Sequence, residues 1–262
     1  MKESPMLTIS NVNVIIKRKL GLSAHIHKIR DAFKKHNLIL FLKQFGILCG
    51  KVLLYIHGAL FLLILILCVL YSFINPPVTS LMLYRRLFSD YPSFAIKYVP
   101  LERIPRNLQR MVVRVEDYKF YKHAGVDAEA LFNAFKLNRR FGRVRYGGST
   151  ITMQVARTLF LVPEQSYLRK YLEILIAIEL DLVMKKSRIL ELYLNYCEWG
   201  KGVYGIGSAA SYYYHKKVQE LTVDESRRIV TILASPLRYT VDNFEGRKSL
   251  RRRYDFLLLH FP

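Results

Sequence analysis

Cysteine and acidic side chains are both scarce in this 262-residue chain. Of its three cysteines, Cys49 and Cys68 lie in or beside a long apolar run near the N-terminus, and only Cys197 lies beyond that run. The region after the run therefore cannot form an internal disulfide, whichever compartment it occupies. The sequence also lacks internal repeats and low-complexity segments. We expect one good-sized domain behind the apolar run, with Cys197 as a small buried hydrophobe.

The shortage of acids leaves a large positive charge. The chain has 41 Lys and Arg against 20 Asp and Glu, a formal net charge of +21. Such an excess indicates an anionic partner, which can be nucleic acid, an anionic membrane or a phosphorylated substrate. Residues 1–51 hold ten basic and two acidic residues, so they carry +8 and the rest of the chain carries +13.

Charged residues are absent from Val52–Ile74, a run of 23 residues. About 20 apolar residues suffice to cross a membrane, so we predict one transmembrane helix here. The positive-inside rule makes residues 1–51 a cytoplasmic tail and places the rest of the chain outside the cytoplasmic membrane. Nucleic acid is not an expected target there, whereas anionic lipid headgroups and a lipid-linked pyrophosphate fit the charge. Two prolines end the helix, and residues 75–107 are expected to be a linker and entry segment that leads into the helix of Glu116.

The first candidate for chemistry is Glu116. A helix is predicted from Leu108 to about Lys119, with Val112 and Glu116 four residues apart on one face. Glu116 thus continues an apolar stripe near a helix C-terminus, where partial burial and the helix dipole favour its protonated form. That suits a carboxylate that must accept and hold a proton. A surface glutamate beside a core stripe fits this stretch equally well.

A glycine pair opens another candidate helix. Gly147 and Gly148 allow close backbone approach, Ser149 can cap the helix, and the free N–H groups can bind an anion. Gln154 and Arg157 follow at helical spacing, and Arg157 would point a cation toward the same anion. Any capped helix can look this way, so the signal is weak by itself.

Two neighbouring segments precede that glycine pair. Residues 127–137 read as a helix. Residues 138–146 form a basic, aromatic loop, which is either a solvated loop or a flap that meets phosphate at the membrane surface.

A buried ionic site is predicted on the helix over 168–184, which is apolar around almost its whole circumference and should lie at the centre of a domain. Glu173 shares a face with apolar residues of this helix, so it needs a partner, which Arg169 or Lys170 can supply. One role is a salt bridge that ties the helix down. We expect Glu173 to do this and also to help build a pyrophosphate pocket.

Two more helices are predicted, over 187–195 and 222–233, the second with Thr222 as cap and Glu225 in capping-box position. Glu191, Tyr193 and Asn195 of the first are expected to hold the fold together rather than to do chemistry. The last segment, 247–261, is basic and then apolar.

Five segments together resemble the motifs of the family 51 glycosyltransferases, the peptidoglycan transglycosylases. In chain order they are Glu116-Asp117-x-x-Phe120-x-x-His123-x-Gly125; Gly147-Gly148-Ser149-Thr150-Ile151-Thr152-Met153-Gln154; Arg169-Lys170-x-x-Glu173; Lys186-x-x-Ile189-Leu190-Glu191-Leu192-Tyr193-Leu194-Asn195; and, more loosely, Arg252-Arg253-x-x-Phe256-Leu257. Five motifs in the right order are far more specific than any one of them. The resemblance covers roughly Pro76 to the C-terminus.

The resemblance implies a mainly α, lysozyme-like, two-lobed glycosyltransferase domain over 108–262, behind one transmembrane helix. The implied reaction is inverting polymerisation of lipid II into glycan strands from an undecaprenyl-pyrophosphate-linked donor in the bacterial inner membrane. No tightly bound cofactor is implied, although a divalent cation, Mg or Mn, near Glu173 is compatible with it. The implied partners are lipid II, the growing glycan, membrane lipids and other cell-wall synthesis or division proteins.

Roles for particular residues follow from the matched motif positions. Glu116 and Glu173 are the implied catalytic residues, with Glu116 as general base. The implied substrate-binding residues are Ser149, Thr150, Gln154, Arg157, Arg169 and Lys170. The implied structural residues are Asp117, Phe120, His123, Gly125, Gly147, Gly148, Lys186, Glu191, Tyr193, Asn195 and Arg252.

Three positions depart from the family's pattern. Met153 stands where Gln is often found, Gln165 stands where a basic residue is common, and Phe256 replaces a small branched residue. None of these changes removes a carboxylate, so activity is still expected. The chain is also expected to be monofunctional, without a transpeptidase domain.

Two rival functions remain open. A lysozyme-like hydrolase or lytic transglycosylase also uses a buried glutamate, but it has no need for the Arg169-Lys170-Glu173 set or the membrane span. An inactive membrane-anchored scaffold would recruit cell-wall enzymes through its basic surface, yet it would not need both Glu116 and Glu173.

Overall fold

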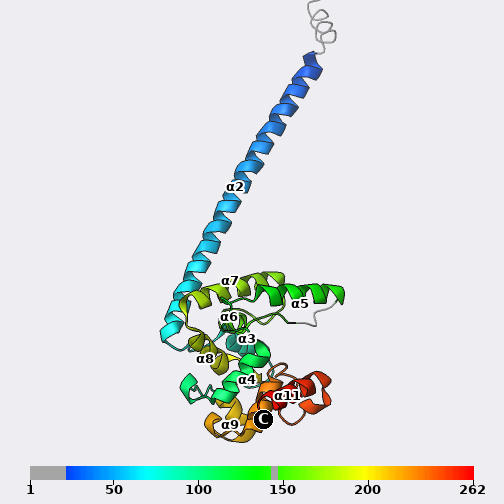
Figure 1. The fold of residues 1–262 in the computed structure, drawn as a ribbon. Coiled ribbons are helices and arrows are strands. Elements are labelled where there is room, and N and C mark those ends of the chain that lie inside the picture. The colour runs from blue at the N-terminus through cyan, green and yellow to red at the C-terminus, as the bar shows by residue number, and fades with distance from the viewer. Residues whose placement is uncertain (1–21, 143–146) are drawn as a thin grey trace, which may run out of the picture. The chain divides into compact units, whose positions relative to one another are not determined.

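The computed structural model describes residues 22–142 and 147–262, and this part of the chain is mainly α-helical, as predicted (Figure 1). Its elements are α2 (Leu22–Phe73), α3 (Ser80–Phe88), η1 (Leu101–Arg103), α4 (Arg106–Glu116), α5 (Ala128–Arg140), α6 (Ile151–Phe160), α7 (Tyr167–Val183), α8 (Lys186–Tyr196), β1 (Glu198–Gly200), β2 (Val203–Tyr204), α9 (Ile206–Tyr214), η2 (Val218–Glu220), α10 (Val223–Ile232), η3 (Phe244–Gly246) and α11 (Lys248–His260). The strands β1 and β2 form one antiparallel pair.

Helix α2 is longer than the predicted transmembrane segment. It begins at Leu22 and ends at Phe73, and its part from Phe33 to Phe73 is long and apolar enough to cross a membrane. The most apolar window of that part has a mean hydropathy of 2.8 and is only 11% buried, unlike the core helix of a soluble domain. The chain divides within α2 into two compact units, 1–60 and 61–262. Residues 1–21 of the expected cytoplasmic tail lie outside the described residues.

The segment expected to be a linker is folded onto the domain. Helix α3 lies within it, and the Thr79 hydroxyl caps α3 by accepting a hydrogen bond from the Met82 N–H at 3.2 Å. The Ser80 hydroxyl donates to the Leu159 carbonyl of α6 at 3.0 Å, and the two helices pack together. The sequence missed this helix because it is only nine residues long and amphipathic.

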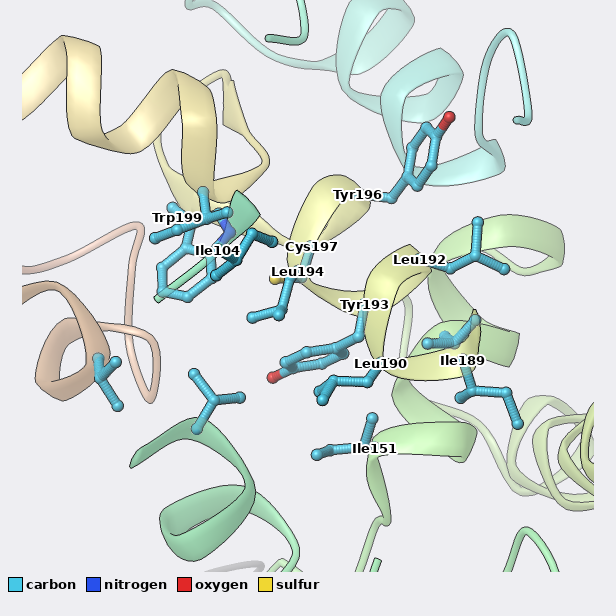
Figure 2. Packing of buried hydrophobic residues seen from close by; sticks show 14 of the residues in the cluster. Ile104, Ile151, Ile189, Leu190, Leu192, Tyr193, Leu194, Tyr196, Cys197 and Trp199 are labelled. Atoms are coloured by element: carbon cyan, nitrogen blue, oxygen red, sulfur yellow. The ribbon is translucent and has the colours of Figure 1, made fainter. Parts of the chain in front are cut away.

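The domain core lies where α8 meets its neighbours. Helix α6 packs against α3, α7 and α8, while α10 packs against α4 and α11. Figure 2 shows side chains of α8, among them Leu190 and Tyr193, beside Ile151 of α6. All three are buried. These two helix groups place α4 and α6 close enough for their side chains to meet across a cleft.

Helix α7 is not buried all round, contrary to the prediction. Its face with Glu173, Ile176 and Leu180 is buried, but Leu168 and Leu182 are 69% and 72% exposed. The physical reason is position: α7 packs on α6 and α8 with one face and runs along the edge of the domain with the other (Figure 1). Apolar periodicity alone cannot distinguish a helix inside a protein from one whose outer face is uncovered.

A buried carboxyl on α7 predicts a pH-dependent stability. Glu179 is 2% exposed and one of its oxygens has no partner among the described residues, and burial raises the pKa of Glu179 from 4.5 to about 7. Between those values the folded state keeps a proton that the unfolded state releases, so stability falls as pH rises, by about 3 kcal/mol in all. We expect Glu179→Gln to stabilise the detergent-solubilised protein by that amount at pH 8 and by about 1 kcal/mol at pH 5, measured by urea unfolding.

The matched control is Glu129→Gln, which alters a carboxylate whose side chain is 71% exposed. It should give no comparable difference between the two pH values. An equal gain for Glu179→Gln at pH 5 and pH 8 would contradict the account of its titration.

Candidate active site

The end of α4 is tied to the start of α6. Helix α4 stops at Glu116, earlier than predicted, because the next side chain, Asp117, turns inward. Asp117 accepts hydrogen bonds from the Ile151 N–H at 2.9 Å and lies 2.9 Å from Nε2 of His123. The Thr150 hydroxyl donates to the Gly125 carbonyl at 2.6 Å. The first two motifs are therefore one structural unit that fixes Glu116 beside α6.

Gly125 has almost no space for a side chain within this unit. Its φ is +81°, and an added Cβ would lie 2.4 Å from the Ala177 carbonyl oxygen of α7. We expect Gly125→Ala to lower the free energy of unfolding by about 2–4 kcal/mol, from left-handed strain plus overpacking. Gly142→Ala is the control, since Gly142 has φ +62° but open space around it, and it should cost about 1 kcal/mol. Equal losses in urea unfolding would mean that packing against Ala177 plays no part.

A cleft of about 420 Å³ opens beside Glu116. Glu116 of α4, Gln154 and Arg157 of α6, and Tyr193 of α8 line it together with the loop 233–238. Arg169, on α7, also reaches this cleft. The structure thus brings Glu116, Gln154, Arg157 and Arg169 together, as the sequence predicted.

Both oxygens of the Glu116 carboxylate accept hydrogen bonds. Oε2 accepts from the Gln154 amide at 3.1 Å, and Gln154 is held in turn by the Tyr193 hydroxyl at 3.2 Å. Oε1 accepts from the Arg253 guanidinium of α11. The carboxylate is thus held by an amide donor on one oxygen and by a guanidinium on the other. The partial burial was predicted rightly, since the side chain is 13% exposed.

The neighbouring hydroxyl and thiol groups stay neutral. Burial, and secondarily the nearby Glu116 carboxylate, raise the pKa of Tyr193 and of Cys197 well above their usual values. Tyr193 therefore acts as a proton donor to Gln154 at neutral pH. The Tyr193 side chain, for which only a structural role was expected, also belongs to the wall of the cleft.

The cap of α6 differs from the prediction. Thr150, and not Ser149, is the N-cap, because its hydroxyl accepts from the Met153 N–H at 3.1 Å. Ser149 instead accepts a hydrogen bond from the Lys170 ammonium at 2.6 Å. Close backbone approach is required at Gly148, where a Cβ would lie 2.7 Å from the Ala130 carbonyl oxygen, but not at Gly147, which has open space.

Glu173 is fully buried and paired with two cations. One oxygen accepts from the Arg169 guanidinium and the other from the Lys170 ammonium, the latter at 2.9 Å. The predicted partner residues are thus both present. Burial lowers the pKa of Lys170, and Glu173 opposes that shift. Glu173 fixes the positions of both cations, and Arg169 also lines the cleft.

The donor set around Glu173 does not fit a divalent cation. Both of its oxygens are already engaged, and the two neighbours that engage them are themselves positive. Over the described residues, no group of three or more His, Cys, Asp or Glu side chains is placed to hold a metal. We therefore derive no step through a metal at Glu173.

The remaining motif residues join segments around the cleft. Phe120 is buried under the Lys186 ammonium, which lies 4.8 Å from the ring centroid. Glu191 accepts from the Leu101 N–H at 2.9 Å, and Asn195 bonds both polar groups of the Val99 backbone. These contacts hold the chain before α4 against α8.

Sequence reasoning missed three charged residues at this site. Arg85 of α3 lines the cleft and forms an ion pair with Glu198 at 3.1 Å. Burial raises the pKa of Glu198, and the nearby Arg85 opposes that shift. Both lay in segments assigned no chemistry. Arg253 was passed over for Arg252, although Arg252 is exposed and Arg253 is the one that reaches Glu116. In a helical-wheel projection of α11, Arg253 falls on the same face as the apolar Leu250 and Leu257, so this spacing could have predicted that it points inward.

The three departures from the motif pattern have different surroundings. Met153 is fully buried in the core. Gln165 lines the cleft, so a cation is absent from that position of its wall. Phe256 lies under the Arg114 guanidinium, 5.7 Å from it. Of the expected basic loop, residues 143–146 lie outside the described residues.

Comparison with known proteins gives a consistent result. The family model described as Transglycosylase matches residues 87–260. A biosynthetic peptidoglycan transglycosylase of Paraburkholderia xenovorans (strain LB400) is 39% identical over 187 residues, which are 70% of this chain and 77% of that protein. Proteins with the same name from Thiobacillus denitrificans (strain ATCC 25259 / T1) and Burkholderia orbicola (strain MC0-3) are each 43% identical, over 60% and 64% of this chain and 67% and 70% of their own lengths.

Proposed function

Because this chain belongs to the transglycosylase family, we propose that it is a peptidoglycan glycosyltransferase that polymerises lipid II, with Glu116 as the general base. The observation that carries the proposal is the Glu116 carboxylate in a cleft otherwise rich in arginine. Arg157 and Arg238 line that cleft, and neither has a carboxylate partner in the part of the chain that the structure describes. An unpaired cation in a cleft favours an anionic ligand such as a pyrophosphate.

The proposed reaction is a direct displacement in which Glu116 is the base and the pyrophosphate is the leaving group. Glu116 takes the proton of the acceptor's sugar 4-hydroxyl as that oxygen attacks the anomeric carbon of the donor. The bond from that carbon to the pyrophosphate oxygen breaks, and its electron pair leaves with the pyrophosphate. A direct displacement of this kind inverts the anomeric carbon, with base and leaving group on opposite faces of the sugar.

Positive side chains stabilise the leaving group. Arg157 and Arg169 line the cleft, and Lys170 is hydrogen-bonded to Ser149 beside them. Charge that develops on the pyrophosphate is stabilised by cations that are already held in place. We propose that Glu173 acts as a positioning residue that holds Arg169 and Lys170, rather than as a group that touches the substrate.

The membrane arrangement is part of the proposal. Helix α2 spans the inner membrane, residues 1–51 lie in the cytoplasm and the domain lies on the opposite side, as the positive-inside rule favours. Within α2 the span covers about residues 52–74, and residues 108–262 carry the catalytic function. Membrane lipids and other cell-wall synthesis or division proteins are its further partners.

Separate reactions with lipid II and with finished peptidoglycan distinguish an enzyme that synthesises glycan from one that degrades it. The full-length protein in detergent is given lipid II in one reaction and purified peptidoglycan in another, and the products are sized on a gel. We expect glycan strands from lipid II and no soluble fragments from peptidoglycan. Fragments without synthesis would identify a lytic enzyme, and a folded protein inactive in both reactions would favour the scaffold.

A further inference from the structure

We propose that Arg253 is the positioning residue of the general base: it fixes the direction of the Glu116 carboxylate. This inference rests on the proposed function of Glu116. It concerns a residue of α11 that lies 137 positions away in the sequence. A contact over that distance requires the C-terminal helix to fold against α4 before the base is in place.

The guanidinium of Arg253 is anchored independently of Glu116. Its Nε and Nη2 donate to the Val230 carbonyl of α10 at 3.3 and 3.2 Å, and Nη2 also donates to Oε1 of Glu116. Both side chains are largely buried, with 16% and 13% exposure. A planar guanidinium held by a helix carbonyl has little freedom left, so it presents its N–H groups in a fixed direction.

The two oxygens of Glu116 are thereby distinguished. Arg253 engages Oε1, while Oε2 faces Gln154, whose own orientation is set by the Tyr193 hydroxyl. A base must accept its proton at a defined place, because efficiency depends on reach and alignment toward the acceptor hydroxyl. The contacts from α6 and α11 together leave the carboxylate one orientation in the cleft.

Arg253 is also the charge nearest to Glu116. The other groups that face it are Arg157 from α6, which has no ion-pair partner in the described residues, and Tyr193 and Cys197, which are neutral. Farther along the cleft Arg85 is paired with Glu198 and Arg169 with Glu173, while Arg238 is exposed. Of these cations, only Arg253 is hydrogen-bonded to Glu116 among the described residues.

The test is the steady-state kinetics of glycan synthesis from lipid II by full-length Arg253→Gln, Arg253→Lys and Arg252→Gln, beside wild type. Arg253→Gln should lower kcat at least about tenfold with KM nearly unchanged, because a misdirected base weakens the transition state and not substrate binding. Arg253→Lys keeps an N–H donor toward Glu116 but not the planar guanidinium, so it should recover part of the lost kcat. Arg252→Gln, which changes the exposed neighbour, should match wild type.

Several outcomes would overturn the inference. A folded Arg253→Gln with the wild-type kcat, or equal effects at positions 252 and 253, would leave the contact a purely structural one. If Arg253→Gln fails to fold in thermal unfolding, Arg253→Lys decides the question, and a wild-type kcat there contradicts the account. Wild-type activity in the same assay tests the proposed function separately, since a wild type that makes no glycan refutes that function and not the role of Arg253.

Discussion

Replacing Glu116 by Gln should abolish glycan synthesis while the protein stays folded. The amide fills the same space but cannot accept the proton of the attacking hydroxyl. General-base catalysis contributes about 10²–10⁴-fold in rate, so we expect kcat to fall by that factor, measured as initial rates of glycan formation from lipid II. The loss should appear in kcat rather than in KM, because the pyrophosphate contacts at Arg157 and Arg169 remain.

The matched control for this prediction is Glu102→Gln. Glu102 is exposed in η1 and forms no ion pair within the described residues. The control makes the same chemical change on the same domain and should leave the rate within about twofold of wild type. Retained activity in a well-folded Glu116→Gln protein would remove Glu116 as the base.

Replacing Glu173 by Gln should lower both the stability of the protein and its rate of glycan synthesis. The carboxylate is fully buried, and its loss leaves Arg169 and Lys170 without their counter-charge. Breaking a buried ion pair on one side costs about 3–5 kcal/mol, and the partial exposure of Lys170 places the expected loss near the lower end. Urea unfolding of the detergent-solubilised protein measures it, and glycan synthesis should fall as well, because both cations lose their fixed positions.

Glu129→Gln is the appropriate comparison for Glu173→Gln. It breaks an ion pair with Lys119 of 2.6 Å, but Glu129 is 71% exposed, so the loss should be below about 1 kcal/mol. If the two substitutions cost the same, burial of Glu173 does not matter. If Glu173→Gln keeps full activity despite a large loss of stability, its proposed positioning of Arg169 and Lys170 is wrong.

The positions of several motif residues could be predicted because their contacts are local in sequence or follow from the need to pair opposite charges. Glu116 stood at a helix end, and Glu173 needed Arg169 or Lys170 at helical spacing, as the structure has them. The capping box of α10, formed by Thr222 and Glu225, was equally readable from spacing and is present. In each case the contact joins residues within a few positions, so periodicity carries the information.

What the sequence could not reveal depends on contacts between distant segments. Glu116 of α4 meets Arg253 of α11, and the Arg85–Glu198 pair joins α3 to β1. Neither follows from local spacing, since each requires knowing which helices pack together. The exposed face of α7 is a similar case, because apolar residues were read as core where the structure leaves them uncovered.

The anomeric configuration of the product tests the central claim most directly. Glycan made from lipid II by the full-length protein is compared with the lipid-linked donor by NMR. The account predicts that glycan forms and that its new linkage has the configuration opposite to the donor's, as direct displacement with a single base requires. A linkage of the same configuration, or no glycan from a folded protein, would contradict the account.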